Sequence, residues 1–185
     1  MPLSGPAWVQ QYPTSTSVDD LVEPFRTNVQ RFLSALSAAG ATVSIADTLR
    51  PQQRLDLMYY SYQVAHSALD PAQVPAIPNV DIQWLHSDDQ GNPDPGASTA
   101  AAAQMTAAYG IVFQPALQSL HALGQAIDMD ISWEGDITIA NEDGSTAVIS
   151  TAPASGQNPA LQQVGATYGV FKLLSDPPHW SSTGH

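Results

Sequence analysis

Cysteine is absent from this chain of 185 residues. Its absence excludes disulfide bonds and thiolate metal sites, so a metal ion would have to be held by histidine, aspartate or glutamate. Basic residues are scarce as well, with 5 Lys and Arg against 17 Asp and Glu and a formal net charge of −12. Five basic side chains can neutralise only a few phosphate groups. We therefore expect neither nucleic acid nor an anionic membrane surface as a partner.

Long apolar runs are also missing near the start of the chain. Residues 1–20 contain no Lys or Arg and no extended hydrophobic stretch. They therefore match neither a secretory signal peptide nor a membrane anchor, and we expect no membrane insertion. A leader removed ahead of residue 1 would leave no trace in this sequence, so the export route stays open.

Length and composition predict one globular domain. The apolar content of 43% is ordinary for a folded protein, and 185 residues are cramped for two full domains. Residues 1–16 carry three prolines and several Ser and Thr, which predicts an extended N-terminal arm. The single domain is then expected over residues 17–185.

Hydrophobic periodicity predicts the order of the elements. Helical spacing of apolar residues indicates helices, and alternation of apolar and polar residues indicates strands. The expected helices cover residues 17–40, 51–68, 98–109 and 159–168. The expected strands cover residues 41–46, 125–131 and 170–174, with a hairpin over 136–150 and a proline-rich, acidic loop over 70–97 that contains a short strand at 80–84. This order predicts an α+β fold, with a central antiparallel sheet and helices packed on one side of it, and not a doubly wound fold.

The first of two motifs that carry chemistry is Ser119-Leu-His121-Ala-Leu-Gly124-Gln-Ala126-Ile-Asp128. Since side chains alternate along a strand, Asp128 is expected on the face opposite the apolar residues, toward His121. Gly124 and Ala126 are small enough for the backbone to approach a site closely. Taken alone, a histidine with a downstream aspartate favours a structural His–Asp pair, and the two small residues shift this only modestly.

The second motif is Asp176-Pro-Pro-His179-Trp180. Two prolines restrict the backbone to an extended or tight-turn shape, so that Asp176 and His179 are expected to project from the same side. The alternative for this motif is a solvated proline-rich turn with a surface histidine. Trp180 is compatible with a pocket wall or with core packing.

Together the two motifs resemble the zinc peptidases that cleave the stem peptide of peptidoglycan. These are the D-alanyl-D-alanine carboxypeptidases and dipeptidases and the L-alanyl-D-glutamate endopeptidases, which share a fold with the hedgehog signalling domain. Their signature is Ser-x-His-x-x-Gly-x-Ala-x-Asp followed later by Glu/Asp-x-x-His, and this chain matches every specified position. The resemblance extends to Thr48-Leu-Arg50-Pro51, where the family places an arginine, although the residues after Arg50 depart from the commoner Arg-Ser-x-x-x-Gln.

The resemblance implies a role for each matching residue. Zinc would be held by His121, Asp128 and His179, with a fourth position open for water. Asp176 would act as the general base and acid. Arg50 would steady the carbonyl oxygen of the substrate, although position alone favours a surface arginine paired with Asp47. Ser119 is similar to the family serine that seats the substrate.

The expected function is therefore that of a zinc-dependent peptidase acting on peptidoglycan in the periplasm or cell wall. Aspartate at position 176, where carboxypeptidases more often have glutamate, favours the L-Ala-D-Glu endopeptidase branch. The alternatives are a D-Ala-D-Ala carboxypeptidase, a zinc-binding module of the same fold that does not cleave, and a purely structural domain in which the motifs are accidental. Delivery by phage lysis, by a secretion machine or through a missing leader stays open, as does the oligomeric state.

Overall fold

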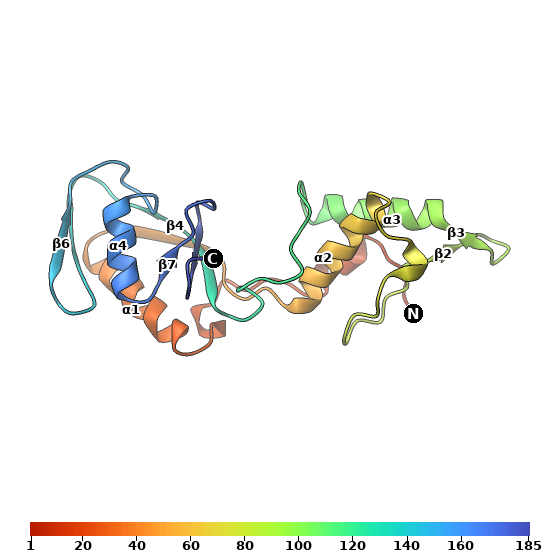
Figure 1. The fold of residues 1–185 in the computed structure, drawn as a ribbon, viewed down its shortest axis with the longest axis horizontal. Helices are drawn as coiled ribbons and strands as arrows, with labels where there is room; N and C mark the ends of the chain where they lie inside the picture. The colour runs from red at the N-terminus through yellow and green to blue at the C-terminus, as the bar shows by residue number, and fades with distance from the viewer. The chain divides into compact units, whose positions relative to one another are not determined.

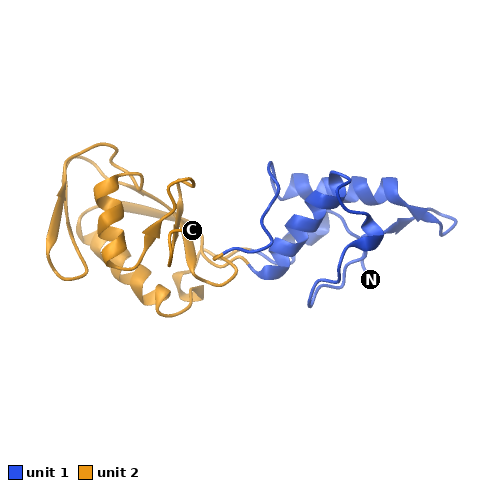
Figure 2. Cartoon of the chain, in the orientation of Figure 1, with its two compact units in different colours: residues 1–13, 51–119 blue, residues 14–50, 120–185 orange.

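The computed structural model describes every residue from Met1 to His185 and divides into two compact units (Figure 2). Unit 1 comprises residues 1–13 and 51–119, and unit 2 comprises residues 14–50 and 120–185. The structure thus divides the chain differently from the expected arm over 1–16 and single domain over 17–185. The difference arises because residues 51–119 bury apolar side chains among themselves, which the length of the chain did not reveal.

The N-terminal residues belong to this local core and are not a continuous extended arm. Pro6–Gln10 form the 3₁₀ helix η1, in which Val9 is buried. Proline is well suited to the first turn of a helix, because its missing N–H has no partner to lose there. Leu3 forms a parallel bridge with Gln83, which anchors the start of the chain within unit 1.

Unit 1 is built on two helices, α2 (Gln52–Ala65) and α3 (Pro95–Ala108) (Figure 1). Residues between them add the 3₁₀ helix η3 (Pro71–Gln73) and a ribbon of two short strands, β2 (His86–Ser87) and β3 (Pro93–Asp94). Residues 80–84 form no strand of their own beyond the bridge at Gln83. The buried core of this unit consists of Leu57, Val64, Ile77, Val80, Ile82, Trp84, Ala102 and Met105.

Unit 2 contains the central sheet, and its four strands run in the order β1-β4-β8-β7 with every neighbouring pair antiparallel. The bounds of these strands are β1 Thr42–Asp47, β4 Ala126–Ser132, β7 Phe171–Lys172 and β8 His179–Ser181. A separate hairpin pairs β5 (Ile137–Ala140) with β6 (Thr146–Ile149). The α+β class and the antiparallel pairing are therefore confirmed, while the specific likeness to the hedgehog fold stays a prediction.

Two helices cover one face of this sheet. They are α1 (Phe25–Ala38) and α4 (Pro159–Thr167), and their apolar residues share a core with Ile127, Met129 and Ile131 of β4. These three strand residues are at most 3% exposed, whereas Asp130 between them is exposed. The alternation predicted for β4 is thus confirmed, and it leaves the face bearing Asp128 free of the apolar core.

The first predicted helix is shorter than its periodicity suggested. Val18–Asp20 form only the 3₁₀ helix η2, capped by the Ser17 side chain, and α1 begins after Pro24. A proline within a helix removes a hydrogen bond and disfavours helical geometry in the residue before it, which ends the first segment. At the other end, Gly40 follows the C-cap with a φ of 83°, in the left-handed conformation expected for it.

Close packing of α4 against β8 yields a stability prediction. A Cβ atom at Gly165 would lie 2.8 Å from Trp180 and 2.9 Å from the Val170 carbonyl oxygen, whereas one at Gly156 would meet nothing nearer than 3.7 Å. We expect Gly165→Ala to lower the free energy of unfolding by about 1–3 kcal/mol, because overpacking forces the neighbours to shift. Gly156→Ala is the matched control, and urea unfolding measures both. Equal stabilities of the two variants would contradict the packing seen at Gly165.

None of the helices combines the length and the apolar character that crossing a bilayer requires. The expectation of no membrane insertion agrees with this finding.

Candidate metal centre

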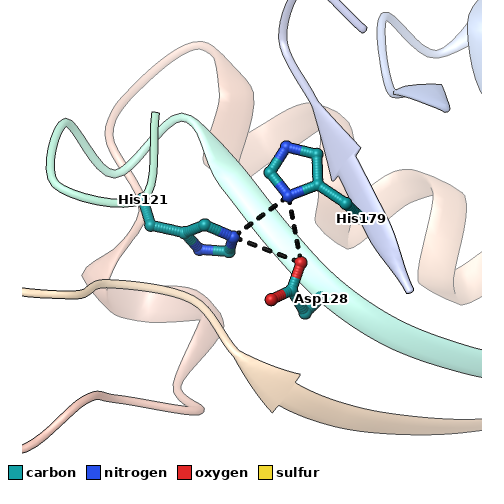
Figure 3. Close-up of side chains that lie close together, drawn as sticks. All are labelled: His121, Asp128 and His179. Atoms are coloured by element: carbon teal, nitrogen blue, oxygen red, sulfur yellow. Dashed lines mark hydrogen bonds and ion pairs between the residues drawn. The ribbon is translucent and has the colours of Figure 1, made fainter. Parts of the chain in front are cut away.

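Three side chains that lie far apart in the sequence converge in unit 2: His121, Asp128 and His179 (Figure 3). Asp128 lies on β4 and His179 on β8, and antiparallel pairing places the two residues directly opposite each other. His121 comes from the turn that leads into β4. The sheet register therefore fixes two members of the cluster, and the turn supplies the third.

The three facing atoms form a nearly equilateral triangle. His121 Nε2 lies 3.2 Å from Asp128 Oδ1 and 3.2 Å from His179 Nδ1, and His179 Nδ1 lies 3.1 Å from Asp128 Oδ1. A tetrahedral ion with bonds of about 2.0–2.1 Å, as zinc makes to nitrogen and oxygen, separates its donor atoms by about 3.3–3.4 Å. The spacing of this triangle therefore fits one small metal ion, and the cluster could hold it.

Backbone carbonyls determine which nitrogen of each imidazole faces the cluster. His121 Nδ1 lies 2.9 Å from the Thr48 carbonyl oxygen, and His179 Nε2 lies 3.2 Å from the His185 carbonyl oxygen. Because a carbonyl oxygen only accepts hydrogen bonds, these two nitrogens must carry the protons. The lone pairs of His121 Nε2 and His179 Nδ1 then point at the Asp128 carboxylate.

Three lone-pair donors this close together repel one another unless a cation lies between them. A metal ion meets this need, and hydrogen bonds from the outer nitrogens to carbonyls are the usual way in which proteins orient histidine ligands. His121 is 2% exposed and His179 is 7% exposed, so water can screen the repulsion only weakly. The donor set and its surroundings are therefore such that the cluster could hold a metal ion.

Protonation of the metal-free cluster follows the same electrostatics. Burial lowers the pKa of His121, but hydrogen bonding and attraction to Asp128 outweigh this, so that its pKa is raised overall. For Asp128, burial raises the pKa, yet the hydrogen bonds and charges of the two histidines hold it well below its usual range. Without a metal, the cluster thus attracts a proton to the position that a cation would occupy.

Gly124 brings the turn that carries His121 close to the segment ahead of α1. Its φ is 64°, and a Cβ atom there would lie 3.1 Å from the Asp20 carbonyl oxygen. The Val22 N–H also donates to the Gly124 carbonyl oxygen at 3.0 Å. The close approach that Gly124 permits is therefore to the chain ahead of α1, and an approach of its backbone to the site stays a prediction.

Arg50 pairs with Asp47, as its position alone predicted. Its Nε and Nη2 atoms both donate to Asp47 Oδ2, and the Arg50 side chain is 26% exposed. Asp47 lies opposite Asp128 in the pairing of β1 with β4, and the Arg50 N–H donates to the His121 carbonyl oxygen at 3.2 Å. Arg50 is thus tied to the metal centre through the backbone, while its contact with a substrate stays a prediction.

The remaining predicted residues lie in different settings. Asp176 is exposed at the first position of a turn, and its carbonyl oxygen accepts from the His179 N–H at 3.1 Å, so the tight-turn alternative is the one observed. Ser119 falls in unit 1, and its role toward the metal centre stays a prediction. Trp180 is fully buried against Phe32 in the core, which rules out a pocket wall.

Two other histidines lie outside the cluster and make ordinary polar contacts. His66 stacks on Tyr62, and His86 is hydrogen-bonded to the Ser4 hydroxyl. The backbone carbonyls of Thr48 and His185, in contrast, orient the two histidines of the cluster. The sequence did not predict them, because every residue has a carbonyl group and no sequence pattern shows where that group points. Lys172 was also not predicted as part of the site. The sequence did offer a signal for it, since it is the only lysine of the chain.

No protein-family model matches this chain, and a search of curated proteins finds no relative of it. The interpretation of the site consequently depends on the geometry and on the motif residues themselves.

Proposed function

We propose that the chain is a zinc metallopeptidase that hydrolyses peptide bonds in the stem peptide of peptidoglycan. The observation that supports the proposal most is the triangle of His121, Asp128 and His179, whose facing atoms lie 3.1–3.2 Å apart. Two imidazoles and a carboxylate form a donor set that suits zinc, and three protein ligands leave one position open. An open position is typical of catalytic zinc and unusual for structural zinc.

Bound zinc would polarise the scissile carbonyl and make water nucleophilic near neutral pH. The protein's own residues supply the proton transfers. In the proposal, the Asp176 carboxylate accepts the proton of the attacking water and then delivers it to the amine that leaves. Its exposed position one turn before His179 is compatible with reaching a bound peptide.

Arg50 is proposed to stabilise negative charge on the carbonyl oxygen of the substrate. Its pair with Asp47 uses Nε and Nη2 and a single carboxylate oxygen, and a guanidinium group has five N–H donors in total. Ser119 is proposed to help seat the substrate, as in the family that the motif resembles.

The branch of the family rests on one residue. Aspartate at position 176 favours cleavage between L-Ala and D-Glu, and D-Ala-D-Ala carboxypeptidase activity is the alternative. A zinc-binding module that no longer cleaves is a candidate of a different class, because the buried cluster alone would serve it equally well. The proposed place of action is the periplasm or cell wall.

Digestion of purified disaccharide tetra- and pentapeptides with zinc-loaded protein tests the function. Mass spectrometry of the products separates the branches, since loss of one D-alanine identifies a carboxypeptidase and release of a peptide beginning at D-Glu identifies the endopeptidase. Intact substrates in the presence of confirmed bound zinc would overturn the peptidase proposal and leave the non-catalytic module.

Zinc binding is expected to depend steeply on pH. The raised pKa of His121 means that its charged form stabilises the metal-free fold below about pH 6.5, the ordinary histidine value, and that this contribution is lost as pH rises through the raised pKa. Zinc requires the deprotonated ligand, so its stabilising effect has the opposite slope.

We therefore expect the increase in melting temperature caused by zinc to be large at pH 8 and to disappear toward pH 5. Thermal unfolding with excess zinc, compared with unfolding in the presence of a chelator across this range, measures it. A zinc-induced increase of equal size at both ends of the range would show that histidine is not among the ligands.

A further inference from the structure

Lys172 is the one lysine of the chain, and it is buried at 9% exposure on β7. A buried ammonium group is costly unless hydrogen-bond acceptors replace the water that it loses. Burial lowers the pKa of this lysine, while the charges of Asp176 and Asp128 act in the opposite direction. A buried Lys172 that keeps its positive charge must therefore be stabilised by specific contacts.

The ammonium group has three donors, and three backbone carbonyl oxygens accept from it. Nζ lies 2.6 Å from the Leu173 oxygen, 2.5 Å from the Asp176 oxygen and 3.0 Å from the His179 oxygen. It also lies 5.7 Å from the centre of the Trp180 ring, in a cation–π arrangement. All three N–H donors of the Lys172 ammonium group thus bind carbonyl oxygens of one short segment, residues 173–179.

This segment connects the proposed base to a metal ligand. The Leu173 N–H donates to the His179 carbonyl oxygen at 3.1 Å, and the His179 N–H donates to the Asp176 carbonyl oxygen at 3.1 Å. The ammonium group lies where these turns meet and neutralises the three carbonyl dipoles that converge on it. Without the cation, those dipoles would repel one another in a buried place.

We propose that Lys172 is a positioning residue, whose ammonium group holds the backbone of residues 173–179 so that His179 Nδ1 stays in the triangle with His121 and Asp128, and so that the turn carrying Asp176 keeps its place ahead of His179. The part that concerns Asp176 rests on the proposed peptidase function. The part that concerns His179 requires only that the cluster binds a metal ion.

Substitution by methionine separates positioning from simple filling of space. Lys172→Met keeps most of the side-chain volume but removes the charge and all three donors. Zinc affinity, measured by competition with a chromophoric chelator, is expected to fall about tenfold to a hundredfold, the loss that follows removal of groups that orient metal ligands. The visible absorption of the cobalt-substituted protein is expected to weaken and shift, since His179 no longer holds its place.

Two further variants complete the design. Arg31→Met removes another cation of unit 2 that lies over an aromatic ring, Tyr168, and should leave zinc affinity and the cobalt spectrum unchanged. Lys172→Arg retains a cation with several N–H donors, and should recover part of the affinity lost in the methionine variant. Zinc affinity within twofold of the parent protein in Lys172→Met, with an unaltered cobalt spectrum, would overturn the proposal.

If Lys172→Met does not fold, the parent protein itself provides the test. Selective ¹⁵N labelling of lysine gives a single side-chain ammonium signal. An ammonium group held by three carbonyls should exchange its protons slowly and remain visible at neutral pH, whereas rapid exchange that abolishes the signal would overturn the proposal. Neither readout needs peptide cleavage, so a protein that binds zinc but digests no muropeptide would refute the proposed function and leave the test of Lys172 intact.

Discussion

His121→Ala is expected to abolish zinc binding. His121 is one of three donors, it is 2% exposed, and its Nε2 lies 3.2 Å from both other donor atoms. Alanine has no atom that can bind the metal, so the variant keeps only the donors of Asp128 and His179. Metal analysis after dialysis should give about one zinc per parent chain and less than about 0.1 per variant chain, as expected when one of three protein ligands is lost.

The stability of the protein should change in parallel. At a free zinc concentration about a thousand times the dissociation constant, the parent fold gains about 4 kcal/mol from binding, and the variant should gain almost nothing. His66→Ala is the matched control, because His66 is exposed and lies outside the cluster. Equal zinc content in His121→Ala and in the parent protein would refute the site.

The sequence predicted the elements of the fold better than their grouping. Periodicity located α1, α2, α4 and the central strand β4, because each of these buries a regular apolar face. It could not show that residues 51–119 enclose a core of their own, since apolar residues of two cores look alike in a sequence. The late start of the first predicted helix, at Phe25 and not at residue 17, in contrast follows from the proline at position 24.

The sequence predicted the three side chains of the cluster, but it did not predict the backbone groups that surround them. The motif spacing identified His121, Asp128 and His179, and the structure brings these three together. The position of Arg50 also predicted its pair with Asp47, which engages two of the Arg50 nitrogens, while its role toward a substrate stays a prediction. The carbonyl partners of both histidines depend on how the chain folds back on itself, which no local pattern records.

The sheet explains why residues about fifty positions apart can act together. β4 lies between β1 and β8, so that Asp128 faces Asp47 on one side and His179 on the other. A charged residue at such a position is tolerated because the apolar core lies on the opposite face of β4. The face of β4 opposite the core is therefore where the charged cluster is found, and the turn that carries Asp176 leads directly into β8.

Asp176→Asn is expected to lower kcat by about 10²–10⁴-fold, the usual effect of removing a general base, while zinc stays bound. Asparagine has a side chain of the same size. The backbone carbonyl oxygen of residue 176, which accepts from the His179 N–H and from Lys172 Nζ, is unchanged, so the turn should persist. The amide cannot accept the proton of the attacking water. Because this transfer takes place only in the transition state, KM should change little.

Asp130→Asn is the matched control, since Asp130 is an exposed carboxylate on β4 two residues from the proposed metal ligand Asp128. It should retain both the zinc content and the rate of muropeptide cleavage of the parent protein. Full activity in Asp176→Asn would show that Asp176 is not the general base. A different carboxylate would then have to accept the proton of the attacking water. An Asp176→Asn variant that binds zinc normally but no longer cleaves would separate metal binding from catalysis. Such a result is expected of a peptidase and not of a module that only binds zinc.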